Sequence, residues 1–557
     1  MKLLKNFILP FVKKLSKISI RKIFNLILDF SPYTFYLLFI KTFFKILKII
    51  LIILKKVLTN IIRYSINIIK ALSNYAKFNL FKFIKIFSAY NKKIKNTYRA
   101  CQEIKKYADE YFTSGIENKP SYLINSSLNE IYNKNYALIL ANSYGVSEPR
   151  LLRQCQVLED MGITPILAGC IPSKEETNSN PNNYFLRTHN DYFYYTTKGY
   201  YLTLRRILIL IEVLLSKLKI EKFTKIQNYI TIFNYYLEVF YLDNLISVEH
   251  FLSTSPVNIK YILSHDYYFL PIGDLLSRRF NIPHLNDIHE YALLQNDSFY
   301  LKYFKSVHID NLHKLYFHRV NYLSIVSEGI KNKLIEHYPF IKGKSHLVRN
   351  VPSLKNQFEE YDNQNLSNIF SSNTNSIRII YSGLITKERG LEELLEASRF
   401  FNKNIEIYLV GPICSDSKNI LRKIKRIQNQ NVYIKLVKSV DYNKIISFNK
   451  FFDIGYLAQP IFSPQKKYSL ANKVFEYMHA GLALFLDKSI EYTNLINENK
   501  NGWLVDDVRN TKNIVNLINS IDSDTLQKYK NNSLKCAKNY IWEKESNSLK
   551  SFLDKNS

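Results

Sequence analysis

From about residue 134 onward, short apolar runs alternate with stretches of helical periodicity. Helices that connect parallel strands cover both faces of the sheet, so such strands are apolar throughout. We expect strands at Tyr136–Ala141, Ile163–Ala168, Lys260–Ser264, Tyr322–Val326, Arg378–Ser382, Glu406–Val410, Val432–Leu436, Asp453–Leu457 and Leu482–Leu486. The predicted fold class is therefore α/β, with Rossmann-like, doubly wound parallel sheets.

The expected strands fall into two series of comparable size. A stretch rich in Asn, Ser and Gln at 353–376 is interpreted as the linker between them. The first series occupies 134–350 and is interrupted at 185–256 by an aromatic and basic helical insertion. The second occupies 377–540 and leaves a C-terminal tail at 541–557. Two such domains facing each other across a cleft bind ligands at the carboxyl ends of their strands, so we expect site residues in the loops that follow strands.

The positive charge of the chain is concentrated near its start. The 557 residues carry a formal net charge of +30, yet residues 1–100 hold 21 Lys and Arg against the single acid Asp29, a balance of +20. The basic character therefore belongs to one segment. Most aromatic residues fall in expected strands and helices and are not interleaved with basic residues, so specific nucleic-acid binding is not indicated.

Residues 1–114 contain no glycine, and from Lys41 onward lysines follow one face of a helical pattern with apolar residues opposite. This pattern predicts a long basic amphipathic helical segment that associates with an anionic membrane surface. Packing of the helix on the protein's own body is the alternative. Spanning is disfavoured because the longest charge-free run is only Phe30–Ile40, although shallow entry by residues 23–54 stays open.

The five cysteines are scattered and form no Cys-x-x-Cys pair, which indicates neither a disulfide framework nor a zinc site. The histidines show no metal-ligand spacing either, so no metal is expected. Together with the basic segment, this pattern favours a cytoplasmic protein that is peripheral at the inner face of the cell membrane.

One candidate phosphate site follows the expected strand Arg378–Ser382. The turn from Gly383 to Gly390 opens a helix expected over Leu391–Phe400, and a helix start presents free N–H groups and a positive dipole end. Lys387 and Arg389 add cations that would neutralise a leaving diphosphate. The alternative is that these two side chains are simply solvated.

A second constellation runs from Leu470 to Gly481 and precedes another expected strand. Lys473 and Glu476 are three residues apart on a predicted helix and share one face. A carboxylate held at the cleft end of a helix suits the two hydroxyls of a ribose. An ordinary Lys–Glu surface pair is the alternative.

These two elements, about 90 residues apart, together resemble the donor half of family 4 glycosyltransferases, which have the GT-B fold and retain configuration at the anomeric carbon. By that resemblance, 377–540 would bind a nucleotide-sugar donor. Gly383 and Arg389 would serve its diphosphate, Glu476 would bind its ribose hydroxyls, and Gly411 would occupy the family's Val-Gly turn near the nucleotide.

The amino-terminal half is similar to the same family. Residues 148–153 resemble its first helix, Ser264–Asp266 its His-Asp turn and Asp287–Glu290 its Asp-x-His-Glu element. Arg349–Pro352 matches the Asn-x-Pro exit into the linker. By this resemblance, 134–350 would be the acceptor-side domain.

His265 and Glu290 are the candidate acceptor-side groups, because either side chain can orient a hydroxyl or move its proton. For His265 the alternative is a cap on the following helix. For Glu290 it is a carboxylate bonded within its own loop.

Three positions depart from the family pattern. Leu384 stands where many members have Arg, and Lys387 is our hypothesis for the replacement cation. Tyr468 stands where members often have a first glutamate, and Ala471 replaces the usual Pro. These departures leave the donor sugar undetermined.

The resemblance implies a transferase that moves a sugar to a lipid-linked or saccharide acceptor in cell-surface glycan synthesis. It implies retention, no metal and no cofactor besides the donor substrate. The alternatives are a GT-B scaffold without transferase activity and a nucleotide-sugar epimerase or hydrolase on the same fold.

Overall fold

The computed structural model describes most of the chain from residue 134 onward. The described residues are 134–141, 148–169, 199–218, 221–236, 257–295, 301–354, 376–402, 404–428 and 433–556, with short pieces at 123–124, 184–186, 244–245, 248–249, 251–253, 360–361 and 369–370. The predicted amphipathic segment 1–114, most of the linker 353–376 and much of the insertion 185–256 lie outside the described residues.

The chain divides into two compact units. The second unit comprises Asn142–Pro165, Lys260–Leu270 and Pro283–Ser557, and the first holds the other parts. In the first unit, the described part of the expected insertion forms helices α8 (Gly199–Leu218) and α9 (Glu221–Tyr236). All of the candidate site residues lie in the second unit.

The first sheet has eight strands in the order β1-β4-β3-β2-β5-β6-β7-β8. Pairs β3–β4, β5–β6, β6–β7 and β7–β8 are parallel, whereas β1 is antiparallel to β4. The strands are β1 (Leu123–Ile124), β2 (Asn135–Ala141), β3 (Ile163–Gly169), β4 (Tyr184–Leu186), β5 (Asn258–His265), β6 (His284–Ile288), β7 (Tyr322–Ile325) and β8 (Ser345–Leu347). Helices of this part are α5 (Pro149–Asp160), α11 (Asp266–Phe280), α12 (Ser306–Tyr316) and α13 (Glu328–His337).

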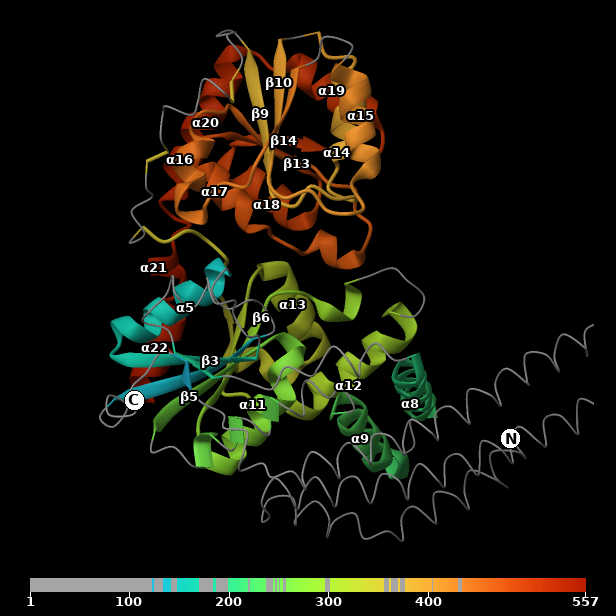
Figure 1. The fold of residues 1–557 in the computed structure, drawn as a ribbon, viewed down its shortest axis with the longest axis vertical. Coiled ribbons are helices and arrows are strands. Elements are labelled where there is room, and N and C mark those ends of the chain that lie inside the picture. The colour runs from blue at the N-terminus through green and yellow to red at the C-terminus, as the bar shows by residue number, and fades with distance from the viewer. Residues whose placement is uncertain are drawn as a thin grey trace, which may run out of the picture. The chain divides into compact units, whose positions relative to one another are not determined.

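The second sheet has six strands in the order β11-β10-β9-β12-β13-β14, and all its pairs are parallel. The strands are β9 (Ile377–Ser382), β10 (Ile405–Val410), β11 (Tyr433–Val437), β12 (Ile454–Leu457), β13 (Ala483–Asp487) and β14 (Gly502–Val505). The helices are α14 (Leu391–Ser398), α15 (Lys418–Gln428), α16 (Ile445–Asn449), α17 (Asn472–Ala480), α18 (Ile490–Asn499), α19 (Thr511–Ser520) and α20 (Ser523–Ala537). Helices α14, α15 and α19 cover one face of the sheet and α16, α17 and α20 the other (Figure 1).

The apolar runs explain these strands. Every residue of β10 is buried, and Tyr136 to Leu140 in β2 are fully inaccessible, as strands covered on both faces require. All nine expected strands are present, with ends within two residues of those predicted. The strand β6 was not expected, because its sequence His-Leu-Asn-Asp-Ile is mixed, yet all five residues are buried.

The segment named a tail from the sequence forms two helices, α21 (Trp542–Glu545) and α22 (Asn547–Lys555). The α22 helix packs on the first sheet. The hydroxyl of Tyr261 in β5 donates to the carbonyl of Leu553 at 2.8 Å, and Tyr322 of β7 shares a 2.8 Å hydrogen bond with Ser548.

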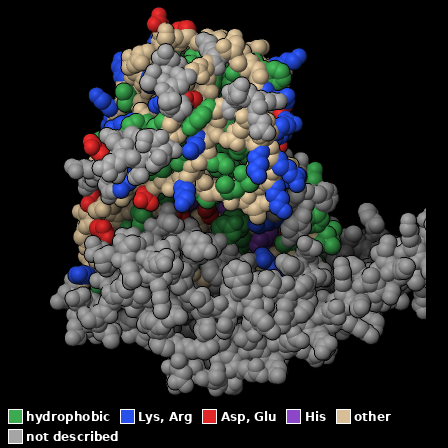
Figure 2. Space-filling model, turned by 45° about the horizontal axis from the view of Figure 1, so that its top comes forward, with side chains coloured by type: hydrophobic (Ala, Val, Ile, Leu, Met, Phe, Trp, Pro, Cys, Tyr) green, Lys and Arg blue, Asp and Glu red, His purple; other side chains and the backbone are tan. Residues whose placement is uncertain are grey.

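None of the helices in the described ranges combines the length and the hydropathy needed to cross a membrane. On the face drawn in Figure 2, lysine and arginine side chains occur at several separate places of the described surface and do not form one continuous stripe.

Candidate active site

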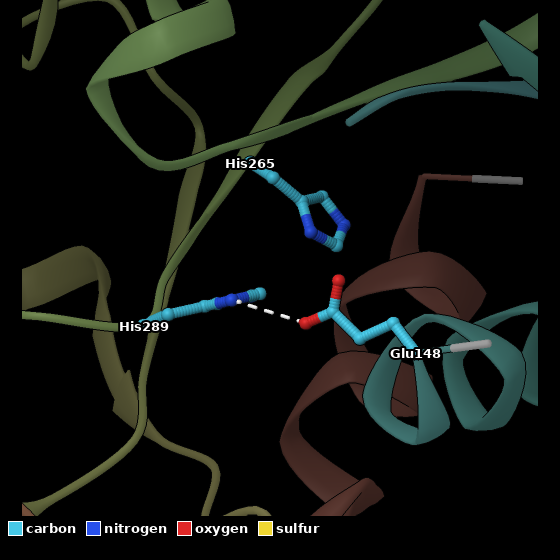
Figure 3. Close-up of side chains that lie close together, drawn as sticks. All are labelled: Glu148, His265 and His289. Atoms are coloured by element: carbon cyan, nitrogen blue, oxygen red, sulfur yellow. Dashed lines mark ion pairs between the residues drawn. The ribbon is translucent and has the colours of Figure 1, made fainter. Parts of the chain in front are cut away.

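Two neighbouring strands of the first sheet bring the acceptor-side residues together. Strand β5 ends at His265, which pairs in register with Asp287 of β6, so the loop after β6 carries His289 and Glu290 to the same edge. The rings of His265 and His289 are edge to face, with centroids 5.0 Å apart. Figure 3 shows Glu148, the residue before α5, facing both rings.

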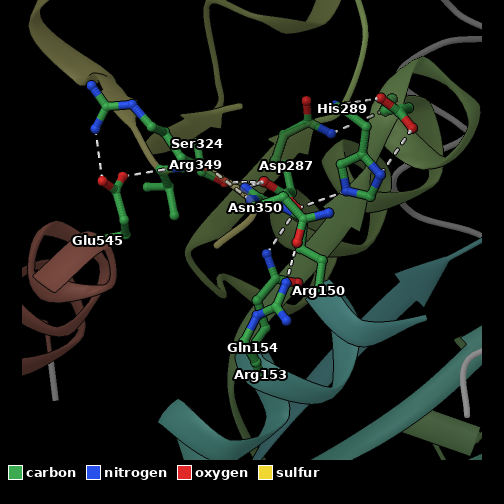
Figure 4. Close-up of polar contacts among 12 residues, drawn as sticks. Arg150, Arg153, Gln154, Asp287, His289, Ser324, Arg349, Asn350 and Glu545 are labelled. Carbon is green, nitrogen blue, oxygen red and sulfur yellow. Dashed lines mark hydrogen bonds and ion pairs between the residues drawn. The ribbon is translucent and has the colours of Figure 1, made fainter. Parts of the chain in front are cut away.

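Asp287 is the centre of a buried polar network (Figure 4). Its carboxylate accepts two hydrogen bonds from Arg150, at 2.6 Å from Nε and 2.5 Å from Nη2. Further donors are Gln154 at 2.8 Å and Ser324 at 2.5 Å, and Nε2 of His289 lies 2.8 Å from the carboxylate. The carboxylate therefore has a partner on every side, and it fixes the ring of His289.

The network separates the charge states of the two histidines. Burial alone would raise the pKa of Asp287, but the charges of Arg150 and His289 hold it well below its usual value. Burial also opposes charge on His289, yet Asp266 and Asp287 raise its pKa to about 9. Burial and the neighbouring His289 lower the pKa of His265 to about 4. At neutral pH the pair is thus one imidazolium and one neutral ring.

The neutral ring of His265 is only 4 % exposed, and neither of its nitrogens has a hydrogen-bond partner among the described residues. A buried polar group without a partner is costly, so this ring is poised for an additional donor or acceptor.

Glu148, His265 and His289 offer ligand atoms that lie within 4.8 Å of one another. Atoms bound to one tetrahedral zinc are about 3.3 Å apart, given bonds of about 2 Å. Nδ1 of His289 lies 3.4 Å from Oε1 of Glu148, which fits that length and is also an ion pair. Two imidazoles and a carboxylate suit a divalent metal, so the expectation of no metal stays a prediction.

The donor-side glycines meet at the carboxyl ends of β9 and β10. Gly383 and Gly411 have φ values of 145° and 138°, which only glycine adopts readily. A Cβ atom on Gly411 would lie 2.1 Å from the carbonyl oxygen of Gly383. On Gly383 it would lie 2.5 Å from Cε of Lys473, so that lysine crosses directly over the turn. The three residues form one group.

Glu476 lies one turn further along α17 and is buried at 6 % exposure. Its Oε1 accepts a hydrogen bond of 3.2 Å from Asn472. Burial raises its pKa, an effect that the charges of Lys473 and Arg153 oppose. Ala471, the residue before this helix, offers no side-chain cap, and the N–H of Val474 donates to the carbonyl of Ala471 at 3.2 Å. The N–H groups of Asn472 and Lys473 are therefore the candidates for binding a ligand.

A pocket of about 670 Å³ lies in the second unit. Its wall includes His289 and Glu290 from the loop after β6, Arg389, and the residues from Ser469 to Asn472, where α17 begins. Gly383, Gly411, Lys473 and Glu476 are not among the residues that line it. The guanidinium of Arg389 forms no hydrogen bond or ion pair with any described residue. The side chain of Glu290 accepts a hydrogen bond from Gln295.

The predicted residues are only partly assembled. Glu290 and Arg389 line the pocket, whereas His265 and Glu476 lie behind residues that do. Lys387 is exposed and is not part of the pocket wall.

Three pocket residues, Arg150, His289 and Lys466, were not among the predicted site residues. The first two lie in segments that carried the family resemblance, so the motifs contained a signal for them. Lys466 lies on the short helical turn Pro464–Lys467, and no sequence pattern marked it.

No protein-family model matches the sequence, and neither does any curated protein. Solved structures do match. Sucrose-phosphate synthase from Thermosynechococcus elongatus has a TM-score of 0.53 and 14 % identity over 76 % of this chain and 99 % of its own. A glycosyltransferase from Rickettsia africae has a TM-score of 0.52 and 15 % identity over 76 % of this chain and 100 % of its own. Anabaena HepE in complex with UDP and glucose has a TM-score of 0.53 and 12 % identity over 75 % of this chain and 99 % of its own.

The chain has the GT-B fold. This result confirms the two-domain, parallel-sheet part of the expected fold, whereas the basic amphipathic segment that was expected before it lies outside the described residues. The structural similarity does not show whether the chain belongs to family 4 or whether transfer retains configuration, and both stay predictions.

Proposed function

We propose that this protein is a retaining glycosyltransferase of the family 4 type that moves a sugar from a nucleotide-sugar to a lipid-linked or saccharide acceptor. The observation that carries the proposal is Arg389, a cation without an ion-pair partner among the described residues, in a pocket that also includes the uncapped start of α17. Both groups attract an anion, and the diphosphate of a nucleotide-sugar supplies one.

The neighbouring residues have roles in the same reaction. Gly383 and Gly411 let the backbone approach the nucleotide closely, Lys473 crosses the first of these turns, and Glu476 binds the ribose hydroxyls. The solved structures with similar folds support a nucleotide-sugar donor, since HepE is seen with UDP and glucose. Because Tyr468 stands where family members often have a first glutamate, the identity of the donor sugar is undetermined.

In the proposed reaction, the bond between the anomeric carbon and the diphosphate oxygen breaks, and its electron pair stays on the diphosphate. The acceptor oxygen bonds to the anomeric carbon on the same face, and its proton passes through Glu290 or His265 to water. Arg389 and the start of α17 stabilise the charge that develops on the leaving group. One such donor is worth about 3–4 kcal/mol at comparable sites.

The acceptor and the location belong to the proposal as well. A basic amphipathic segment at 1–114 would hold the enzyme at the inner face of the cell membrane, where lipid-linked acceptors of cell-surface glycan synthesis are found. Lysines recur along that segment and disfavour a membrane span, so the proposed association is peripheral.

The test is turnover of UDP-, GDP- and ADP-sugars by the full chain, measured as release of the nucleoside diphosphate and as glycosylated product. We expect Arg389→Ala and Glu476→Ala each to lower kcat about 100-fold or more. The exposed residues Arg422 and Glu498 provide matched controls, and Arg422→Ala and Glu498→Ala should leave kcat unchanged.

Circular dichroism and Tm must show that each variant is folded. Wild-type rates in both Arg389→Ala and Glu476→Ala contradict the site assignment. Release of free sugar without transfer indicates a hydrolase, and no binding of any donor indicates a scaffold.

A further inference from the structure

The position after the first glycine of the donor turn lacks a cation. Leu384 stands there and is 48 % exposed. The sequence suggested Lys387 as the replacement, but that side chain is exposed and outside the pocket wall. A single arginine would then face a leaving group whose two phosphates carry at least two negative charges.

Lys466 lies in the pocket wall instead, on the short helical turn Pro464–Lys467. Its Nζ donates a 3.0 Å hydrogen bond to Oε1 of Gln459, a neutral group, and it forms no ion pair within the described chain. Gln459 is itself held, because its backbone N–H donates to Asp487 at 3.1 Å. A neutral side chain thus positions the lysine, and no carboxylate among the described residues contacts its ammonium group.

The charged surroundings of Lys466 are mixed. Burial lowers the pKa of Lys466, and the charge of Arg389 is the next-largest cause in the same direction. The carboxylates of Asp487, Glu290 and Glu388 oppose that shift. Asp487 already accepts hydrogen bonds from the N–H groups of Gln459 and Ser489. Two cations therefore share one wall of the pocket, each without a bonded carboxylate among the described residues.

Like charges that line one pocket repel each other, and an anion bound between them removes that cost. A diphosphate oxygen that accepts from both cations would gain two charge-assisted hydrogen bonds. The start of α17 belongs to the same wall, and the positive end of its dipole points the same way in charge. Two cations and a helix start therefore favour a doubly charged phosphate group in this pocket.

We infer that Lys466 is a catalytic residue that binds the departing diphosphate together with Arg389 and so supplies the charge that Leu384 does not. This assignment rests on the proposed function. As the bond to the anomeric carbon breaks, its electron pair moves onto the oxygen that Lys466 and Arg389 contact. The interaction strengthens toward the transition state, so its loss lowers kcat more than it raises KM.

The decisive comparison uses Lys466→Ala, Lys466→Arg, Lys387→Ala and Lys467→Ala in the full chain. Lys467 is the matched control, because it follows Lys466 on the same turn but is exposed and outside the pocket wall. We expect Lys466→Ala to lower kcat about 100-fold. Lys466→Arg should restore most of the rate, and Lys467→Ala should stay within twofold of wild type.

A second measurement separates this inference from the proposed function. The Kd values of UDP, GDP and ADP are measured for the same variants by calorimetry, with no need for turnover. Lys466→Ala should raise the Kd of the tightest-binding nucleotide at least tenfold. The Kd of this variant should also depend less on salt concentration than that of the wild type. If wild-type protein binds a nucleotide but transfers no sugar, the proposed function fails while the role of Lys466 as an anion ligand is still tested.

Wild-type kcat and wild-type nucleotide affinity in folded Lys466→Ala overturn the assignment. A large loss in Lys387→Ala with none in Lys466→Ala also overturns it, and returns the role to the residue suggested by the sequence. If Lys466→Ala does not fold, Lys466→Gln keeps the hydrogen-bonding side chain without the charge and replaces it in both assays.

Discussion

Nη2 of Arg150 lies 2.5 Å from Oδ1 of Asp287, and both side chains are buried, at 1 % and 0 % exposure. The two residues are 137 positions apart in the sequence, so the contact joins α5 to β6. Because Asp287 also bonds to His289, which lines the pocket, this ion pair links the packing of α5 against β6 to the position of a pocket residue.

Breaking that pair should destabilise the protein strongly. Asp287→Asn leaves the guanidinium of Arg150 buried without a counter-charge, and we expect a loss of about 3–5 kcal/mol in the free energy of unfolding. Urea titration followed by circular dichroism measures it. The exposed pair of Lys488 and Asp506, with side chains 55 % and 72 % exposed, is the control. Asp506→Asn should cost less than about 1 kcal/mol, and equal losses at both sites would refute the argument.

His289 should make stability depend on pH in the alkaline range. Its folded-state pKa of about 9 exceeds the ordinary value of 6.5. A raised pKa stabilises the fold fully below the unfolded value, and that contribution is lost as pH rises through the folded value. The free energy of unfolding of the wild type should therefore fall between pH 6.5 and 9.

Two separate histidine substitutions test this prediction, one at His289 and one at a control position. His289→Gln should flatten the dependence across that window, whereas His318→Gln, at an exposed position, should preserve it. An unchanged slope in His289→Gln would show that another group titrates there.

The donor turn should not tolerate a side chain at Gly411. Gly411→Ala places a methyl group against the carbonyl of Gly383 at a φ of 138°, which we expect to cost at least about 2 kcal/mol and to weaken nucleotide affinity. At Gly343 an added Cβ meets nothing within 4 Å, so Gly343→Ala is a nearly neutral control. Thermal unfolding and UDP, GDP or ADP titrations check both effects; a neutral Gly411→Ala argues against close approach of the two turns.

The first part of the chain should be a membrane anchor. Deleting residues 1–90 removes most of the basic segment, and we expect the truncated protein to leave vesicles that contain anionic lipid. Vesicle co-sedimentation at low and high salt measures the difference. Neutral vesicles are the control, since they should retain little of the full chain. Undiminished binding by the truncated protein would move the anchor to the aromatic and basic region 185–256.

The sequence predicted the architecture well because the rule behind it is simple. Strands such as β10 are buried on both faces, and their continuous apolar residues show this directly. Strand β6 was missed because Asn286 and Asp287 look like loop residues. Their polarity is compensated by partners distant in sequence, since Asn286 donates to Ser264 and Asp266, and Asp287 binds Arg150.

Placement was predictable where a residue belongs to a turn or a helix start, although the functional roles stay predictions. Gly383 and Gly411 do meet, and Arg389 does line the pocket. The position of Lys466 was not predictable, since it depends on how the short turn Pro464–Lys467 directs one long side chain. The exposure of Lys387 could not be predicted either, because sequence spacing does not show on which side of a loop a lysine lies.

The central claim is that the pocket beside Arg389 binds a nucleotide-sugar, and the most direct measurement is the Tm of the full chain with a panel of UDP-, GDP- and ADP-sugars. A bound donor stabilises the folded state by mass action. The account predicts that at least one donor raises the Tm of the wild type in a concentration-dependent manner, and that Arg389→Ala abolishes the shift while Arg422→Ala retains it. A Tm unmoved by every donor, or moved equally in Arg389→Ala, would contradict it.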